Sequence, residues 1–245
     1  MKYKSAFVSD IHLGTKFSKT EQFLKFIKEN EFENLYLVGD IIDGWAIKRK
    51  FKWYQSHSDV IQKLLRKARK GTAIYYIPGN HDEFLRGFLP LLLGDRIHIV
   101  DSAEYITING KKYYITHGDF FDAITMTKKW LAILGDYGYD LVLHLNEPIQ
   151  YIRKKLGYKK HWSLSKYVKD NVKSSVSFIN DYENVLSSFA KQKGYDGVIC
   201  GHIHKAEIRK IDEVDYLNCG DWVENCTALV ETYEGEFKIL NYLNS

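Results

Sequence analysis

Short apolar runs that end in polar clusters recur along this chain, and they constrain its fold more than any other feature. Each run is rich in β-branched and aromatic residues, a composition that favours strands. The runs are SAFV before Asp10, NLYLV before Gly39, AIYYI before Pro78, YYIT before His117 and GVIC before Gly201. Between the first three runs, residues 18–30 and 56–70 show the apolar spacing of helices. Alternating strands and helices predict a layered α/β sheet.

Turn signals indicate a second set of strands. Asn109-Gly110 is typical of a hairpin within residues 96–116, and Glu234-Gly235 indicates another near the C-terminus. We therefore expect a two-sheet β-sandwich flanked by helices, with each half of the chain supplying one sheet. The helix over residues 56–70 should begin at a serine or aspartate and end in basic residues before a glycine.

Residues 123–193 interrupt the strand pattern and read as helices throughout. We expect a helical cap inserted within a single domain that spans residues 1–245. Within the cap, residues 151–173 carry eight basic residues against a single acid. Together with Trp130 and Trp162, this stripe is typical of a helix face that rests on anionic lipid. A solvated helical face is the alternative.

Charge and cysteine content narrow the class of protein. A net charge of +4 is too small to argue for nucleic acid binding on its own. Three cysteines without a CxxC pair do not suit a disulfide framework and favour a reducing cytosol. The N-terminal segment lacks the apolar core of a signal peptide. Asp136 and Asp140 interrupt the most apolar stretch, so we expect a cytoplasmic protein that meets any membrane from the side.

Five clusters at the ends of the apolar runs carry side chains that bind metals. They are Asp10-Ile11-His12, Gly39-Asp40, Gly79-Asn80-His81-Asp82, His117-Gly118-Asp119 and Gly201-His202-Ile203-His204. In extended backbone, residues i and i+2 project to the same side, so D-x-H and H-x-H each present two ligands toward one point. A glycine before Asp40, Asn80 and His202 allows the backbone to approach that point closely. In open α/β sheets the point lies beyond the carboxyl ends of the strands.

The clusters supply more donors than one tetrahedral ion can use, and we therefore predict two metal ions. The seven donors are Asp10, His12, Asp40, Asn80, His117, His202 and His204. A nitrogen and oxygen set without thiolate suits Mn²⁺, Fe, Zn²⁺ or Co²⁺. We take Mn²⁺ as the working choice, with Fe or Zn²⁺ as alternatives. Two neighbouring divalent ions need a bridging anion, for which Asp40 is the natural candidate, and such a site attracts phosphate.

The ordered series D-x-H, GD, GNHD, HG and GHxH over residues 10–204 resembles the calcineurin-like metallophosphoesterase superfamily. The segments GDIIDGW, KRKFKW, PGNHDEFLR, HGDFFD and CGHIHKAEI are similar to the bacterial branch of UDP-2,3-diacylglucosamine hydrolases, pyrophosphatases of lipid A biosynthesis. The resemblance implies that one metal takes Asp10, His12, Asp40 and His204, and that the other takes Asp40, Asn80, His117 and His202. It also implies a four-layer fold in which the helical insertion caps the active site and receives acyl chains.

The resemblance favours a hydrolase that converts UDP-2,3-diacylglucosamine into UMP and a lipid sugar 1-phosphate. We expect it to be cytoplasmic and peripheral on the inner membrane surface, with an anionic membrane as partner and with neither nucleic acid nor an obligate protein partner. The alternative is a general phosphodiesterase or phosphatase that acts on soluble nucleotides or nucleic acid. A non-catalytic scaffold would be marked by lost ligands, and all seven donors are present.

His81 and Asp82 are predicted to act in catalysis beside Asn80. The lipid A hydrolases usually have arginine where this chain has His81, and histidine is also the general phosphoesterase form. As an imidazolium oriented by Asp82, His81 would donate a proton to an alkoxide leaving group. A pyrophosphate leaves as a phosphate monoester and needs only a fixed cation. Asn80 would help to neutralise charge on the equatorial oxygens.

Other polar residues are candidates for substrate binding or for structural roles. Candidates for substrate binding are Asn80, His81, Asp122 and His202, and the resemblance adds Asn171 and Lys173, which would reach the headgroup or its phosphates. Asp43 either orients a metal ligand from behind or starts a helix. Asp119 and Asp122 have the same two interpretations. The histidines expected to be structural or on the surface are His57, His98, His144 and His161.

Overall fold

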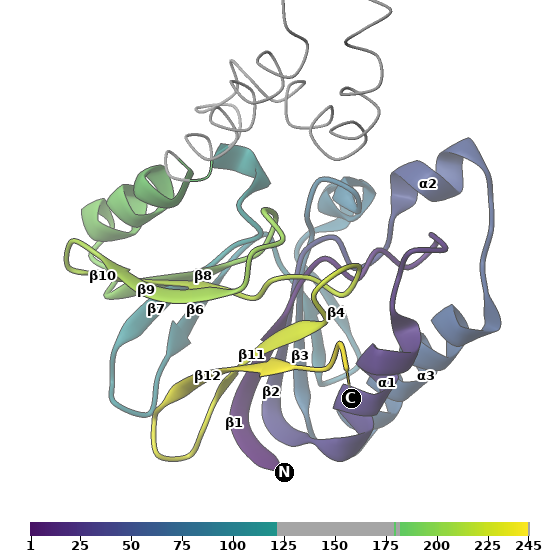
Figure 1. Cartoon of the computed structure of the whole chain (residues 1–245), viewed down its shortest axis with the longest axis horizontal. Helices are drawn as coiled ribbons and strands as arrows, with labels where there is room; N and C mark the ends of the chain where they lie inside the picture. The colour runs from purple at the N-terminus through teal and green to yellow at the C-terminus, as the bar shows by residue number, and fades with distance from the viewer. Residues whose placement is uncertain (122–178, 180–181, 245) are drawn as a thin grey trace, which may run out of the picture. The chain divides into compact units, whose positions relative to one another are not determined.

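The computed structural model of the chain describes residues 1–121, 179 and 182–244, and its strands form two mixed sheets (Figure 1). One sheet contains β1 (Lys2–Val8), β2 (Glu31–Val38), β3 (Ala73–Ile77), β4 (Leu91–Leu93), β5 (Ile97–Ile99), β11 (Thr227–Glu231) and β12 (Phe237–Asn241). The other contains β6 (Ala103–Ile106), β7 (Lys112–Ile115), β8 (Gly197–Cys200), β9 (Glu207–Ile211) and β10 (Val214–Asn218). Their orders are β12-β11-β1-β2-β3-β5-β4 and β6-β7-β8-β10-β9.

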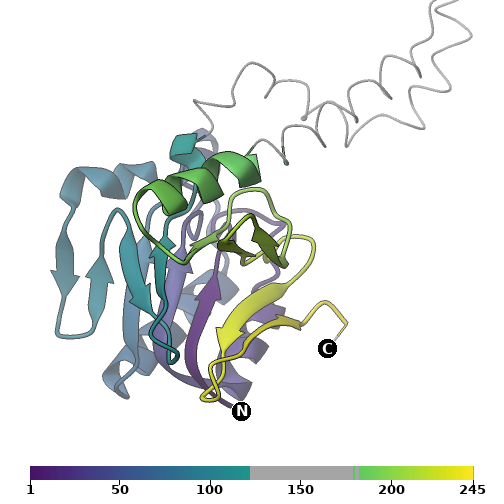
Figure 2. The ribbon, with the colours of Figure 1, turned by 90° about the vertical axis from the view of Figure 1, so that its left-hand side faces the viewer.

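Helices cover the outer faces of both sheets (Figures 1 and 2). The named helices are α1 (Thr20–Glu29), α2 (Gly44–Arg49), α3 (Gln55–Arg69) and the 3₁₀ helices η1 (Glu83–Phe88) and η2 (Asp119–Phe121). Helices α1 and α3 pack on the seven-stranded sheet through buried side chains such as Phe26 and Leu64. The helical residues 186–192 pack on the five-stranded sheet, where the ring centroids of Phe189 and Tyr114 lie 5.3 Å apart. The predicted two-sheet α/β arrangement flanked by helices is confirmed.

Strand alternation divides the core into two parts. Along β1, Ala6 and Val8 belong to the cluster that α1 and α3 cover, whereas Phe7 belongs to the cluster between the sheets. The Phe7 ring stacks on Tyr36 of β2 at 4.9 Å between centroids. Because successive side chains point to opposite faces, one strand serves both parts of the core.

The prediction that each half of the chain supplies one sheet is wrong. Strands β6 and β7 leave the first half for the five-stranded sheet, while β11 and β12 return to the seven-stranded sheet. Strand β11 pairs antiparallel with β1, and all its residues are buried. A strand buried on both faces is stabilised best in the interior of a sheet, which explains this position.

Helix α3 begins differently from the sequence-based expectation. Its N-cap is Tyr54 rather than a serine or aspartate. The backbone N–H of Tyr54 points at Nδ1 of His57, 3.4 Å away, and the N–H of Gly14 donates to the same nitrogen at 3.2 Å. A buried histidine therefore takes the place of a capping carboxylate and ties the start of α3 to the loop after β1.

The chain divides into two compact units, residues 1–120 with 186–245, and residues 121–185. Most of the second unit lies outside the described residues, and so do the basic stripe and the two tryptophans predicted for the cap. The helical cap over residues 123–193 therefore stays a prediction. In the part of the chain that the structure describes, no helix has the length and apolar character of a membrane span.

A buried polar contact joins the two sheets. The Tyr105 hydroxyl on β6 donates to the buried carboxylate of Glu231 on β11 and lies 2.8 Å from the Ser5 hydroxyl on β1. The N–H of Ile108 donates to the other Glu231 oxygen at 3.0 Å. A buried carboxylate is tolerated only when its oxygens are hydrogen-bonded, so the two sheets depend on each other at this point.

We expect Tyr105→Phe to lower the free energy of unfolding by about 1–3 kcal/mol, because it leaves a buried acceptor without its donor. Urea denaturation followed by fluorescence measures this change. Tyr233→Phe is the matched control, since Tyr233 also donates to a glutamate but at the surface. Equal losses in both variants would contradict a stabilising role for the buried contact.

Candidate metal centre

Strand register brings the five polar clusters together in two sets. In the seven-stranded sheet, parallel pairing aligns Val8 with Leu37 and Val38 with Ile77, so the loops after β1, β2 and β3 leave at the same end. In the five-stranded sheet, parallel pairing aligns Ile115 with Ile199, so the loops after β7 and β8 also leave together. These are the loops that carry the predicted ligands.

The backbone is strained at several of the candidate ligands. Five non-glycine residues of the clusters adopt left-handed conformations with φ between 52° and 72°: Asp10, His12, Asp40, His202 and His204. Such conformations cost side-chain-bearing residues on the order of 1 kcal/mol or more each, and they concentrate at functional sites. Packing in the rest of the fold must therefore hold these turns in place.

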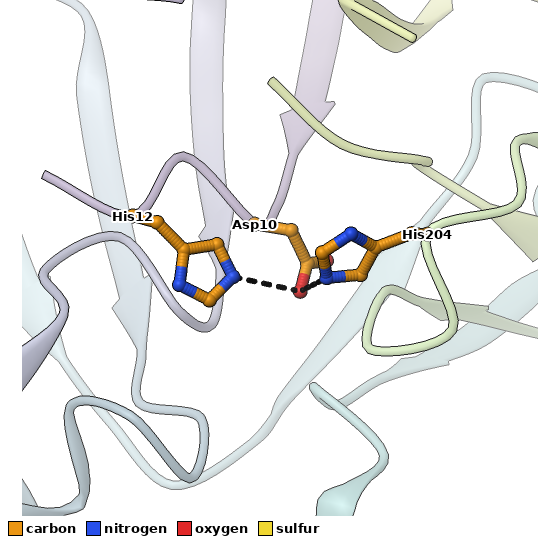
Figure 3. A group of neighbouring side chains, drawn as sticks. All are labelled: Asp10, His12 and His204. Atoms are coloured by element: carbon orange, nitrogen blue, oxygen red, sulfur yellow. Dashed lines mark ion pairs between the residues drawn. The ribbon is translucent and has the colours of Figure 1, made fainter. Parts of the chain in front are cut away.

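The first group of candidate ligands surrounds the Asp10 carboxylate (Figure 3). His204 Nε2 lies 3.2 Å from Asp10 Oδ1, and His12 Nε2 lies 3.9 Å from the same oxygen on the other side. The Nδ1 of His12 faces the Asp43 carboxylate at 3.3 Å. A carboxylate that holds one imidazole nitrogen leaves the other available to a metal, which is the usual arrangement behind metal-binding histidines.

The second group contains Asp40, His117 and His202. His117 Nδ1 lies 2.9 Å from the Val38 carbonyl, to which it can donate, and this contact directs Nε2 toward Asp40 Oδ2 at 3.4 Å. The ring centroids of His117 and His202 are 5.1 Å apart. The backbone N–H of His202 donates to Asp10 Oδ2 at 3.0 Å, which links the second group to the first.

Asp40 lies between the two groups. Its Oδ2 is 3.4 Å from His117 Nε2 and 3.9 Å from His12 Nε2, so it faces one histidine of each group. Its Oδ1 accepts the backbone N–H of His81 at 2.8 Å. Two ligands of one metal, each about 2.1 Å from it, lie about 3–3.5 Å apart, and these spacings are near that range. The position matches the predicted bridging role, which the structure does not test.

Asn80 follows β3 and stands between two residues that contact Asp40. Its neighbours Gly79 and His81 both lie against Asp40. Asn80 Oδ1 and His12 Nε2 are buried, and neither makes a hydrogen bond within the described part of the chain. Buried polar atoms without partners are rare and indicate an ion or water that would complete them. The donor set therefore fits divalent cations.

Charge coupling within the site is strong. Burial alone would raise the pKa of Asp40, but the nearby His117 imidazole lowers it to about 2. Burial alone would lower the pKa of His117, and the Asp40 carboxylate raises it to about 10. Burial alone would lower the pKa of His204, and the Asp10 carboxylate raises it to about 9. A cation that binds here would replace protons on these histidines, as in metal sites generally.

Three glycines allow the ligands to approach. A Cβ added at Gly79 would lie 2.3 Å from Asp40 Oδ1 and 2.6 Å from His117 Cδ2. A Cβ at Gly201 would lie 2.7 Å from Asp10 Oδ2, and one at Gly39 would lie 2.2 Å from the His117 ring. Gly39 also has a left-handed φ of 82°. The expectation that glycine before each ligand serves close approach agrees with this geometry.

His81 is oriented by Asp43, and the expectation that Asp82 orients it is wrong. His81 Nδ1 lies 3.1 Å from Asp43 Oδ1, and Nε2 lies 3.9 Å from Asp40 Oδ2. Burial lowers the pKa of His81, but its pairing with Asp43 and the other carboxylates raises it above its ordinary value. The ring of Trp45, a residue that sequence reasoning did not single out, lies 4.2 Å from the His81 ring.

Asp43 satisfies both interpretations that the sequence left open. Its Oδ1 accepts the N–H of Ala46 at 2.7 Å, which caps the start of α2. The same carboxylate faces His12 through Oδ2 and His81 through Oδ1. Burial alone would raise the pKa of Asp43, but the two histidines and the Ala46 N–H hold it well below its usual range.

Asp82 instead joins two of the ligand loops. Its carboxylate accepts the N–H of Gly79 at 2.5 Å and the N–H of Ile41 at 2.9 Å, and the Tyr76 hydroxyl donates to it at 2.5 Å. The pKa of Asp82 is raised, first by burial and then by Asp40. Its contact with Ile41 could not be predicted, because the loop after β2 lies 41 residues before it in the sequence.

The other polar residues considered in the sequence analysis lie outside the two ligand groups or outside the described part of the chain. Asp119 accepts from Arg86 Nη2 at 2.8 Å, and His98 stacks on Tyr75 with ring centroids 4.9 Å apart. His57 is buried at the start of α3. The predicted residues that lie outside the described part of the chain are Asp122, His144, His161, Asn171 and Lys173.

Comparison with known proteins assigns the chain to a family. The model of the calcineurin-like phosphoesterase family matches residues 3–206, and the chain belongs to that family. A UDP-2,3-diacylglucosamine hydrolase from Haemophilus influenzae is 24% identical, and the match covers 95% of this chain and 97% of that protein. One from Psychromonas ingrahamii is 28% identical over 91% of each chain. A solved archaeal phosphodiesterase superposes with a TM-score of 0.46 at 16% identity, covering 97% of this chain and 98% of that chain.

The chain is a metal-dependent phosphoesterase of the hydrolase class. Its family implies divalent metals, and the grouped carboxylates and imidazoles are suited to hold them. Which metal binds, and which of the seven predicted donors coordinate it, stay predictions.

We expect Gly79→Ala to lower phosphoesterase activity about 100-fold, because displacing ligands by about 1 Å is enough for such a loss. It should also reduce the increase in thermal stability that Mn²⁺ gives the parent protein, measured by calorimetry. Gly87→Ala is the matched control, since a Cβ there meets nothing within 4 Å. Unchanged activity and Mn²⁺ stabilisation in Gly79→Ala would contradict this account of the site.

Proposed function

We propose that this protein hydrolyses the pyrophosphate of UDP-2,3-diacylglucosamine and releases UMP and the lipid sugar 1-phosphate. The observation that carries the proposal is the match to hydrolases of that name over more than nine tenths of both chains. Such coverage includes the inserted segment, where a lipid-specific cap would have to lie. The grouped metal-binding residues supply the hydrolytic part of the proposal.

Two divalent ions, with Mn²⁺ as the working choice, would be held in this site. One would be bound by Asp10, His12, Asp40 and His204, and the other by Asp40, Asn80, His117 and His202. When bound, the pair would acidify a water to a pKa of about 7 and stabilise negative charge on the phosphorus oxygens. The protein's own contribution is to fix the imidazoles through Asp43 and the Val38 carbonyl, so that little reorganisation is needed.

His81 is proposed to act on the substrate directly. It is partly exposed, with 24% of its side chain accessible, and it is held between Asp43 and Trp45. Beside a pyrophosphate it would provide a fixed positive charge, as we expect arginine to do in the lipid A hydrolases. Beside an alkoxide leaving group it would also donate a proton. Asp82 is proposed to position the loops rather than to contact substrate.

The cellular setting follows from the substrate. We propose that the protein works in the cytoplasm, peripheral on the inner membrane surface, because a lipid-linked sugar nucleotide resides in the bilayer. Asn171, Lys173 and Asp122 are proposed to contact the substrate headgroup or its phosphates. Neither nucleic acid nor an obligate protein partner is required by this reaction.

The direct test is product analysis by mass spectrometry after incubation with UDP-2,3-diacylglucosamine and Mn²⁺. We expect UMP and the lipid sugar 1-phosphate in equal amounts, because one water cleaves one anhydride bond. Asp40→Ala, prepared in the same way, is the control and should release neither. No UMP at high enzyme concentration would remove the lipid substrate from the proposal and leave a phosphoesterase of another substrate class.

One feature favours a second candidate, a phosphodiesterase acting on soluble nucleotides. His81 is suited to protonate an alkoxide leaving group, whereas the phosphate that leaves a pyrophosphate needs no proton donor. A higher kcat/KM for a nucleotide diester than for the lipid substrate would favour this candidate.

We expect His81→Ala to slow cleavage of a phosphodiester about 100-fold or more, the usual contribution of general acid catalysis. Cleavage of the pyrophosphate substrate should fall less, since it loses only a neighbouring cation. Steady-state rates on both substrates, with His98→Ala as the control, measure the difference. Equal losses on the two substrates would contradict the distinction between proton donor and fixed cation.

A further inference from the structure

We propose that residues 45–52 and 84–93 form a docking surface for an anionic lipid membrane beside the metal centre. The inference deepens the proposed function and rests on it for the lipid nature of the substrate. Each half of this docking surface is defined by the described residues. The first half is basic and aromatic, and the second is apolar.

The basic half projects from the end of α2. Lys48, Arg49, Lys50, Phe51 and Lys52 are consecutive exposed residues. Phe51 is 76% exposed, although a phenyl ring gains by leaving water. No acidic residue lies between Asp43 and Asp59, so the positive charge of this segment is not balanced along the chain. An exposed ring among cations is typical of segments that insert at the boundary between headgroups and acyl chains.

The apolar half comes shortly after Asn80, the candidate ligand that follows β3. Five large apolar side chains in it are between 37% and 67% exposed: Phe84, Phe88, Leu91, Leu92 and Leu93. The three leucines form β4, one of the two edge strands of the seven-stranded sheet. An exposed apolar edge strand is a liability for a protein that stays in water. At its end, Leu93 lines a pocket together with Arg69 and Arg96, which add further cations.

Side-chain and backbone contacts join the two halves to each other and to the metal centre. Trp45 Nε1 donates to Glu83 Oε1 at 3.4 Å, and a Cβ added at Gly44 would lie 2.9 Å from the Phe84 ring. Trp45, which is 44% exposed, also packs on His81. In Figure 1, α2 lies at the opposite end of the seven-stranded sheet from the N-terminus, the end where β1, β2 and β3 finish. The docking surface thus begins beside the metal centre and continues along the sheet edge, where Leu93 pairs with Ile97 and Ile97 with Ile74 near the start of β3.

The combination of charge and apolar exposure selects a membrane over a nucleic acid. Cations alone would serve either polyanion. Single-stranded nucleic acids are bound by aromatic rings on which successive bases stack. The exposed rings of this surface would serve either ligand, whereas the exposed aliphatic side chains of Leu91, Leu92 and Leu93 give bases no ring to stack on. Aliphatic groups gain free energy in the acyl region of a bilayer. A docked membrane would deliver a lipid-linked substrate directly to the adjacent site.

The test is co-sedimentation of the full chain with vesicles of phosphatidylethanolamine and phosphatidylglycerol, compared with vesicles of phosphatidylcholine alone. We expect binding to the anionic vesicles that weakens as salt is raised. Replacing Lys48, Arg49, Lys50 and Lys52 together with alanine should weaken binding more than about 100-fold, since each cation near such a surface contributes about 1 kcal/mol. Phe51→Ala should weaken it about tenfold.

A matched control removes the same charge elsewhere, by replacing Lys28, Lys112, Lys193 and Lys210, all exposed, with alanine. Retained binding in this control supports the assignment. The proposal is overturned if the Lys48, Arg49, Lys50 and Lys52 variant binds anionic vesicles as well as the parent, or if the parent binds no better to them than to phosphatidylcholine. It is equally overturned if single-stranded DNA binds more tightly than the vesicles and the same four cations account for that binding.

The vesicles contain no substrate, so this outcome is independent of the reaction. UMP release from detergent-dispersed UDP-2,3-diacylglucosamine should be unchanged in the variant that lacks the four cations. Vesicle binding without UMP release by the parent would refute the proposed function and leave the docking surface standing. UMP release without vesicle binding would refute the docking surface alone.

Discussion

The rest of the site depends on the contacts of one buried carboxylate, that of Asp40. It faces His117 at 3.4 Å and His12 at 3.9 Å, and it accepts the N–H of His81 at 2.8 Å. These three residues come from three different strand ends. A buried carboxylate is costly unless it is paired, and here its partners are the candidate ligands His117 and His12 and the backbone N–H of His81. The fold therefore holds Asp40 in place, and Asp40 in turn defines the centre of the site.

The architecture supplies this convergence by register and by local strain. Parallel pairing of β1, β2 and β3 brings three loops out at one end, and parallel pairing of β7 and β8 brings out two more. Left-handed turns at Asp10, His12 and Asp40 then redirect the side chains. Asp82 ties the loops after β2 and β3 through backbone N–H groups, so the strain is held by buried hydrogen bonds.

The sequence predicted the elements that have local signals. Glycine spacing and the D-x-H and H-x-H patterns indicated the ligand clusters, and the strand ends that carry them are where the patterns placed them. The distribution of strands between the sheets could not be predicted, because the place of β11 beside β1 depends on tertiary pairing. The partner of His81 was wrongly predicted for a similar reason. Asp82 is adjacent in sequence but turns toward Gly79 and Ile41, whereas Asp43 arrives from another loop.

We propose that Asp40 is shared by two divalent ions held by side chains from five loops. Low-temperature electron paramagnetic resonance of the protein loaded with Mn²⁺ tests it most directly, because two ions that share a carboxylate are magnetically coupled. We expect the spectrum of an exchange-coupled pair at two Mn²⁺ per chain. A spectrum of isolated Mn²⁺ at saturation, or saturation at one ion per chain, would contradict it.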